Sequence, residues 1–260
     1  SGPRARNRIF QEEDTKMKKL TKLLAASLAA LTLMGLTACG ASAPADTTAA
    51  PAAADTTAAA GLDADVQAIV DRGVLRVGVK NAVIGFGYQD PITGEYTGME
   101  IDIAKALADQ LGVDVEFTTV TAATRTELLD SGDIDCVLAT FTISDERKQS
   151  WDFTTPYYTD HVTVLVEDSS GIKSLADLKD KLVGVSSGST SARALTAAMI
   201  DAGVIEGTGF DKDTFDPATW KDGIAFQQFD DYPGISTALA AGQVDAFCVD
   251  KSILAVYKTE

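Results

Sequence analysis

Apolar and polar positions along residues 62–161 follow two alternating periods, which predict strands separated by helices. Residues 74–79 (VLRVGV) are apolar enough for a buried strand, and residues 100–111 repeat apolar side chains at helical spacing. The pattern then continues as strand, short helix and strand over residues 113–118, 124–129 and 133–138. This order predicts a mainly parallel sheet with right-handed crossovers.

The same alternation restarts after residue 161 and predicts a second α/β lobe. Strands are expected over residues 162–166, 182–185, 224–229 and 244–249. Helices are expected between them, over residues 174–178, 191–202 and 233–241. Residues 203–223 are rich in Gly and Asp and lack clear periodicity, so we assign this insertion no role.

The part of the chain before residue 62 is typical of export and tethering. Residues 17–39 contain a basic start, an apolar run and the sequence LTACG, which predict a lipoprotein signal peptide with a lipobox and a lipid on Cys39. The alternative is an ordinary export signal that contains a cysteine. Residues 1–16 precede this signal and are expected to be a non-native leader or a mis-called start. Residues 40–61 are mostly Ala, Thr, Asp and Pro, which predicts a flexible tether.

Composition removes several classes of function. A formal net charge of -16 over 260 residues argues against nucleic acid and against electrostatic binding to anionic lipid. The single histidine, His161, excludes a multi-histidine metal site, and no pattern predicts a metal, a cofactor or a catalytic triad. Cys136 and Cys248 each lie in an apolar strand pattern, which favours buried free thiols over a mutual disulfide.

A candidate ligand site follows the third strand. Thr140 and Thr142 come directly after that strand, and Ser144 is the expected N-cap of a helix that contains Arg147. Ligands of open α/β sheets bind at the carboxyl ends of strands, and an arginine can hold a carboxylate with two parallel hydrogen bonds. The alternative is a surface turn with a solvated arginine.

The second lobe supplies a complementary set. Its second strand breaks into the sequence SSGST at residues 186–190, where a helix begins, and Ser189 and Thr190 would present N–H groups to an anion. The spacing is not that of a phosphate loop, so a carboxylate fits better than a nucleotide. A plain N-cap is the alternative. Asp250 ends the last strand and could accept from an ammonium, so Arg147 and Asp250 together predict a site for a zwitterion.

Five stretches of the sequence closely resemble the extracellular solute-binding proteins of family 3, the polar amino-acid receptors of ABC importers. These stretches are LRVGVK (75–80), TGEYTGMEIDIAKALA (93–108), ATFTISDERKQSWDFTTPYY (139–158), VGVSSGST (183–190) and VDAFCVDKSIL (244–254). The resemblance implies a two-lobed α/β periplasmic-binding-protein fold, a Venus flytrap. Lobe one would be residues 62–161 and lobe two residues 162–260, and the return of the chain to lobe one is expected to be truncated.

The resemblance also implies a role for each site residue. The ligand α-carboxylate would be held by Arg147, Thr142, Ser189 and Thr190. The α-ammonium would be held by Asp250 and Thr140, with Asp245 structural. In the aspartate/glutamate receptors, which this chain resembles most, matching residues hold the side-chain carboxylate: Lys80, Arg125, Thr140 and Tyr232. Val83 stands where many members place a stacking aromatic residue, which argues against histidine or arginine as the ligand.

These observations predict a non-enzymatic receptor that captures glutamate or aspartate and delivers it to the transmembrane subunits of an ABC permease. It would be a monomer outside the cytoplasm, held at the cell membrane by the lipid on Cys39. Glutamine, cystine or another polar amino acid is an alternative within the same class. A dehydratase-like enzyme or a sensory module on the same fold would be a different class.

Overall fold

The computed structural model describes residues 7–10 and 62–258, which fold as an α/β protein with three sheets. The predicted signal peptide at residues 17–39, with Cys39, and the predicted tether at residues 40–61 lie outside the described residues. In the part of the chain that the structure describes, no helix has the length and apolar character that a membrane crossing requires.

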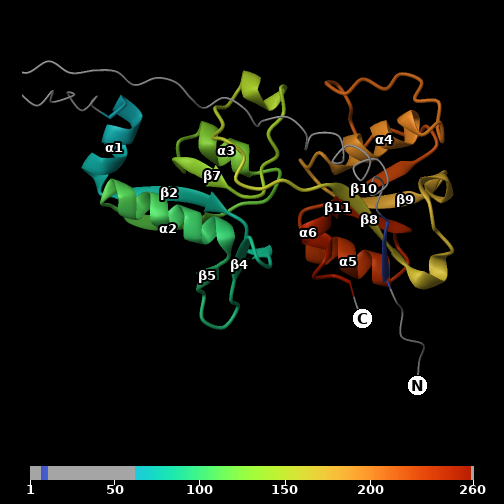
Figure 1. The fold of residues 1–260 in the computed structure, drawn as a ribbon, viewed down its shortest axis with the longest axis horizontal. Coiled ribbons are helices and arrows are strands. Elements are labelled where there is room, and N and C mark those ends of the chain that lie inside the picture. The colour runs from blue at the N-terminus through green and yellow to red at the C-terminus, as the bar shows by residue number, and fades with distance from the viewer. Residues whose placement is uncertain (1–6, 11–61, 259–260) are drawn as a thin grey trace, which may run out of the picture. The chain divides into compact units, whose positions relative to one another are not determined.

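Lobe one builds a parallel sheet around a central strand. β2 (Val74–Val79) pairs with β6 (Asp114–Thr119) on one side and with β7 (Cys136–Leu138) on the other. α2 (Met99–Leu111) lies between β2 and β6 in the chain and runs along β2 (Figure 1), and α3 (Arg125–Asp130) lies between β6 and β7. The predicted β-α-β-α-β order and the parallel direction are confirmed.

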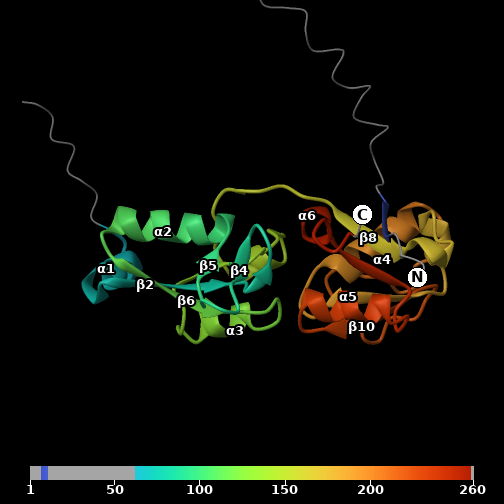
Figure 2. The same ribbon diagram turned by 90° about the horizontal axis from the view of Figure 1, so that it is seen from below.

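The two helices cover opposite faces of this sheet (Figure 2). Leu75, Val77 and Val79 of β2 pack against the face of α2 that carries Ile101 and Ala104. This face follows the helical spacing seen in the sequence. Apolar burial of this kind contributes about 25 cal/mol per Å², so these contacts fix α2 on the sheet.

Several small elements of lobe one were not predicted. They are α1 (Ala64–Arg72) and a three-stranded antiparallel sheet made of β3 (Ala82–Val83), β4 (Gly87–Gln89) and β5 (Tyr96–Thr97). No side chain of α1 is buried, so its sequence carries little of the periodicity that marks a packed helix. The short strands are too brief to show an alternation.

Two predictions in lobe one need correction. The third strand begins at Cys136 and not at residue 133, because the Asp135 carboxylate turns back to accept from the backbone N–H of Arg76 at 2.8 Å. The helix expected from Ser144 is only a 3-10 turn, η2 (Arg147–Gln149). Trp151 follows this turn, and its indole N–H donates to Asp130 at 2.7 Å, which draws the chain away from a helical path.

Lobe two builds a mixed five-stranded sheet in the order β1-β8-β11-β9-β10. β8 is Val162–Glu167, β9 is Leu182–Ser186, β10 is Ala225–Phe229 and β11 is Ala246–Asp250. β9 is parallel to β10 and β11, whereas β8 is antiparallel to β11. β1 (Asn7–Phe10) adds to β8 in the antiparallel direction.

Strict alternation along the central strands separates two cores. Val164 of β8 and Cys248 of β11 belong to the core under α4 (Ser191–Asp201). Leu165 and Phe247, one position away, belong to the core under α5 (Tyr232–Ala240). The remaining short helices are η3 (Asp168–Ser170), η4 (Leu175–Leu178) and α6 (Lys251–Leu254). η4 is the helix predicted from residue 174, and it is a 3-10 helix. The two cysteines of residues 62–258 are free, Cys248 buried and Cys136 half-buried.

Candidate functional site

Arg147 is held at the end of a tight turn after β7. The Ser144 hydroxyl accepts from the Arg147 backbone N–H at 3.2 Å, so Ser144 closes the turn although no long helix follows. The guanidinium lies over the ring of Phe141, 4.5 Å from its centroid. It donates to the carbonyl of Thr142 at 2.9 Å and to that of Gly188 at 3.2 Å. An arginine has more N–H donors than these two contacts use, so Arg147 retains donors for a ligand.

Gly188 belongs to the loop between β9 and α4 in lobe two, and it meets lobe one at close range. Its φ is +74°, and a Cβ at this position would lie 2.7 Å from the carbonyl oxygen of Ala122. Ser189 and Thr190 follow, and Thr190 is the N-cap residue of α4. The close approach therefore brings the helix start predicted to bind a carboxylate next to Arg147. An ion pair between Glu146 and Arg193 links the same two segments.

Arg125 shares the Phe141 ring with Arg147. It is 3% exposed, and its guanidinium carbon lies 4.0 Å from the ring centroid. One Nη donates to the carbonyls of Ala139 at 2.9 Å and of Thr140 at 3.2 Å, whereas the buried Nε has no partner. Burial, and then the nearby Arg147, lower the pKa of Arg125 to about 10. Two guanidinium groups on one ring make this an electropositive region that favours an anion.

Lys80 and Tyr232 lie together on the same side of the site. The Lys80 side chain is 6% exposed, with its Nζ 5.7 Å from the centroid of the Tyr232 ring. Burial and, to a smaller extent, the charge of Arg125 lower the pKa of Lys80 to about 7, and Glu100 opposes both. Tyr232 begins α5 and is buried. The structure thus brings together Lys80, Arg125 and Tyr232, and their predicted role toward a ligand side chain stays a prediction.

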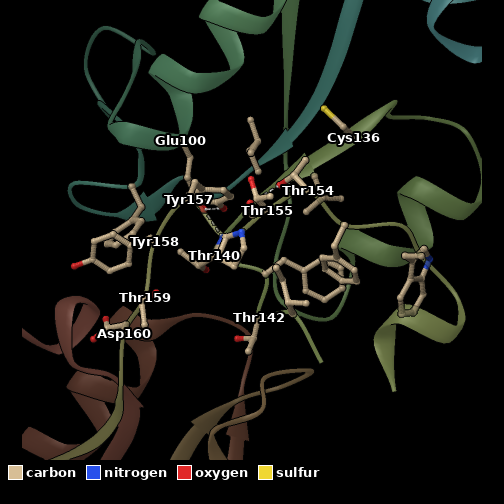
Figure 3. A pocket seen from close by; sticks show the side chains of 18 of the residues that line it. Glu100, Cys136, Thr140, Thr142, Thr154, Thr155, Tyr157, Tyr158, Thr159 and Asp160 are labelled. Atoms are coloured by element: carbon tan, nitrogen blue, oxygen red, sulfur yellow. Dashed lines mark hydrogen bonds between the residues drawn. The ribbon is translucent and has the colours of Figure 1, made fainter. Parts of the chain in front are cut away.

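Glu100 was not recognised in the sequence, yet it is central to this cluster. Its side chain is fully buried, at 0% exposure. Its Oε1 accepts from the backbone N–H of Thr140 and from the hydroxyl of Tyr157, both at 2.6 Å (Figure 3). The available signal was an acidic residue on the same helical face as Ile101 and Ala104, where the pattern calls for an apolar side chain.

Thr140 is held in an unusual conformation by its neighbours. Its φ is 47°, a left-handed value that is strained for a β-branched residue. Glu100 accepts from its N–H and Arg125 donates to its carbonyl, so both peptide groups of Thr140 are fixed by buried charges. Strain of this kind is often found at binding sites, where it presents a side chain in a defined direction.

A pocket of about 670 Å³ opens next to Thr140 (Figure 3). Its polar end includes Glu100, Thr140, Thr142, Tyr157 and Asp250. The rest of the lining is mainly apolar and includes Leu107, Leu129, Cys136, Val137, Trp151 and Phe153. The predicted site residues that do not line it are Lys80, Arg125, Arg147, Ser189, Thr190 and Tyr232. Arg125 contacts two lining residues, Thr140 through its carbonyl and Phe141 through its ring.

Asp250 ends β11 and carries a carboxylate at the edge of this pocket. Burial raises the pKa of Asp250, the neighbouring Asp160 adds to this effect, and Arg125 opposes it. A cation bound here would restore the charged form. Asp245, in contrast, accepts from the backbone N–H of Leu182 at 2.8 Å, which supports its predicted structural role.

The molecule has two α/β lobes, and each contributes polar groups to one small site. This arrangement is that of a solute-binding protein with the periplasmic-binding-protein fold. The chain belongs to the bacterial extracellular solute-binding proteins of family 3, whose sequence profile matches residues 75–207.

Three curated relatives extend this finding. The glutamine-binding protein of Geobacillus stearothermophilus is 34% identical over 88% of this chain and 80% of its own. The glutamine-binding protein GlnH of a Bacillus subtilis ABC transporter is 35% identical over 92% of this chain and 77% of its own. The glutamate-binding protein GluB of Corynebacterium efficiens is 30% identical over 92% of this chain and 71% of its own.

The fold is also that of solved structures. An ancestral arginine-binding protein bound to arginine superposes with a TM-score of 0.59 at 36% sequence identity, over 72% of this chain and 74% of that one. All these proteins are binding proteins. The chain is therefore a binding protein and not an enzyme, which removes the dehydratase-like alternative.

Proposed function

We propose that this chain is the amino-acid receptor of an ABC importer and that its ligand is L-glutamine. The observation that carries this proposal is the match to two glutamine-binding relatives across 88% and 92% of the chain. The sequence favoured an acidic ligand and kept glutamine as an alternative. The relatives support the glutamine alternative better.

The proposed binding mode uses both ends of the amino acid. The remaining donors of Arg147 and the start of α4 at Ser189 and Thr190 hold the α-carboxylate, together with Thr142. Asp250 and Thr140 hold the α-ammonium. A micromolar dissociation constant corresponds to about -8 kcal/mol, and several charge-assisted hydrogen bonds of about 1.5–3 kcal/mol each suffice for this after the cost of closure.

Glutamate is the second candidate, and one feature favours it. Lys80 and Arg125 are two buried cations near each other, and Arg125 keeps a buried Nε without a partner. A side-chain carboxylate would compensate both charges, which are costly to bury unpaired. GluB supports this candidate.

Calorimetry of the full chain with each standard amino acid tests the function. We expect L-glutamine to bind most tightly, with L-glutamate weaker, and binding of neither would overturn the proposal. Asp250→Asn should weaken glutamine binding by about tenfold or more, because the ammonium loses a charged acceptor. The matched variant Asp245→Asn should lower stability and leave the affinity within about twofold, since Asp245 bonds the Leu182 backbone.

The location of the receptor is proposed from the sequence alone. We infer that the signal at residues 17–39 exports the chain and that Cys39 carries a lipid that retains it at the membrane. Expression of the full chain in a bacterial host should place it in the membrane fraction. Cys39→Ala should abolish lipid incorporation, and unchanged labelling by a radioactive fatty acid would contradict the anchor.

A further inference from the structure

Lobe one buries a complete carboxylate beside the two cations predicted to meet the ligand's side chain. In the described residues, the buried charged side chains are Lys80, Glu100 and Arg125, all from this lobe. A carboxylate in such a place is expensive unless it is paired and hydrogen-bonded. An ionised Glu100 therefore depends on the cations and hydrogen-bond donors around it, which compensate the cost of burying its charge.

The contacts of Glu100 favour its ionised form. Oε1 accepts two hydrogen bonds of 2.6 Å, from the Thr140 N–H and the Tyr157 hydroxyl (Figure 3), whereas Oε2 is buried without a partner. Burial is the largest influence and leaves the pKa of Glu100 above its ordinary value, while these two donors, Lys80 and Arg125 act in the opposite direction. The negative charge thus acts on the same cations that would face a ligand side chain.

These three side chains, Lys80, Glu100 and Arg125, set the net charge near the ligand side chain. Arg125 and the protonated form of Lys80 contribute positive charge, and the Glu100 carboxylate offsets one such charge. A ligand carboxylate in this region is attracted less strongly than it would be by the cations alone. The advantage of a carboxylate over a neutral amide is therefore smaller. The Glu100 carboxylate therefore neutralises part of the positive charge that the side chain of an acidic ligand would otherwise neutralise.

We propose that Glu100 is a specificity-determining residue of this site, because its charge shifts the preference of the receptor from an acidic to an amide side chain. This inference rests on the proposed function, since it requires that an amino acid bind next to Lys80 and Arg125. It assigns Glu100 no direct contact with the ligand. It also differs from a purely structural role, in which Glu100 would only hold Thr140 and Tyr157 in place.

Glu100→Gln separates the two roles, because glutamine has nearly the same shape and still offers a carbonyl oxygen to Thr140 and Tyr157. Dissociation constants for L-glutamine and L-glutamate are measured by calorimetry on the full chain. The ratio of the two affinities should shift toward glutamate by about tenfold or more, as expected for the loss of a nearby buried charge. The matched surface variant Glu116→Gln, on an exposed position of β6, should leave the ratio unchanged.

Tyr157→Phe provides the structural comparison. It removes a hydrogen bond from Glu100 without changing any charge, so it should weaken both ligands by a similar factor. If Glu100→Gln does not fold, as judged by thermal unfolding, Glu100→Ser makes the same change of charge with room for water. Wild-type protein that binds neither ligand overturns the proposed function and this inference with it. Wild-type binding with an unchanged ratio in the Glu100 variants overturns this inference alone.

Discussion

The two lobes bury different kinds of polar groups. In lobe one, the described buried polar side chains are all charged: Lys80, Glu100 and Arg125. In lobe two, they are all hydroxyls: Thr163, Ser186, Ser191 and Thr196. Lobe two thus buries neutral groups, with Asp250 at the edge of the pocket, whereas lobe one contains all the buried charged side chains of the described residues.

This difference has an energetic reason. A buried hydroxyl is satisfied by one local bond, as when Thr196 donates to the carbonyl of Ala192 at 2.9 Å. A buried charge must be compensated by other charges, so it ties together segments that are far apart in the chain. Glu100 in α2 and Arg125 in α3 both fix Thr140, for example. Selectivity and pH dependence are therefore expected to arise in lobe one.

The largest expected effect comes from removing a lobe-one cation. Arg147→Ala should weaken amino-acid binding by about 3–5 kcal/mol, because the bound α-carboxylate would be left without its charged partner. Calorimetry on the full chain measures this change. Lys148→Ala is the matched control, since Lys148 is an exposed neighbour whose ion pair with Asp145 spans 3.5 Å. A loss of less than about tenfold for Arg147→Ala would refute its role.

Gly188, a neutral residue of lobe two, should affect binding through its small size and not through charge. Gly188→Ala would place a Cβ 2.7 Å from the Ala122 carbonyl oxygen, at a φ of +74°. Gly203→Ala has a similar φ of +70° with nothing within 4 Å, so it shares the backbone strain without the clash. The backbone strain should cost each variant about 1 kcal/mol of stability, and the clash should add to this loss in Gly188→Ala. Only Gly188→Ala should also weaken binding, and equal affinities of the two variants would show that the contact with lobe one is dispensable.

The affinity for glutamate should depend on pH through Lys80 of lobe one. Lys80 has a pKa of about 7 and is faced by Arg125 of α3, Glu100 of α2 and Tyr232 of α5. It gains a proton as the pH falls through this value, while the side chain of free glutamate, with a pKa near about 4.3, stays charged. Glutamate affinity should therefore rise by up to about tenfold from about pH 8 to about pH 6, with glutamine affinity nearly constant.

Lys80→Met is the control for this titration. It removes the ammonium group and should make glutamate affinity independent of pH over the same range. A pH dependence that persists in Lys80→Met would assign the titration to another group.

The smallest effect is expected inside lobe two. Thr196→Val replaces a fully buried hydroxyl whose only described bond is local, within α4. The free energy of unfolding should fall by no more than about 1.5 kcal/mol in urea denaturation. The ratio of glutamine to glutamate affinity should not change. A change in that ratio would show that lobe two also sets selectivity, and the contrast between the lobes would fail.

The elements with strong periodicity could be predicted because local pattern and burial agree in them. β2, α2, β9 and α4 appear where the sequence places them, within one or two residues. The helix expected after Ser144 became a single turn, since a contact between Trp151 and Asp130, distant in the chain, competes with it. Local signals do not contain such a contact.

The site divides in the same way. Arg147 and Asp250 could be selected from the sequence, because they follow strands and strands end at one edge of a sheet. Glu100 could not, because its position on a helix predicts only that it is buried, and a lone acidic residue in an apolar stripe has no evident partner.

The sequence by itself determined the class of fold, the order of the strands and helices in each lobe, and the residue types available to a zwitterion, since these depend on local periodicity and on chemistry at strand ends. Only the tertiary structure decided that Lys80, Glu100 and Arg125 share one buried cluster. Charges interact through space, and the energy of each depends on neighbours that the chain brings together only when it folds.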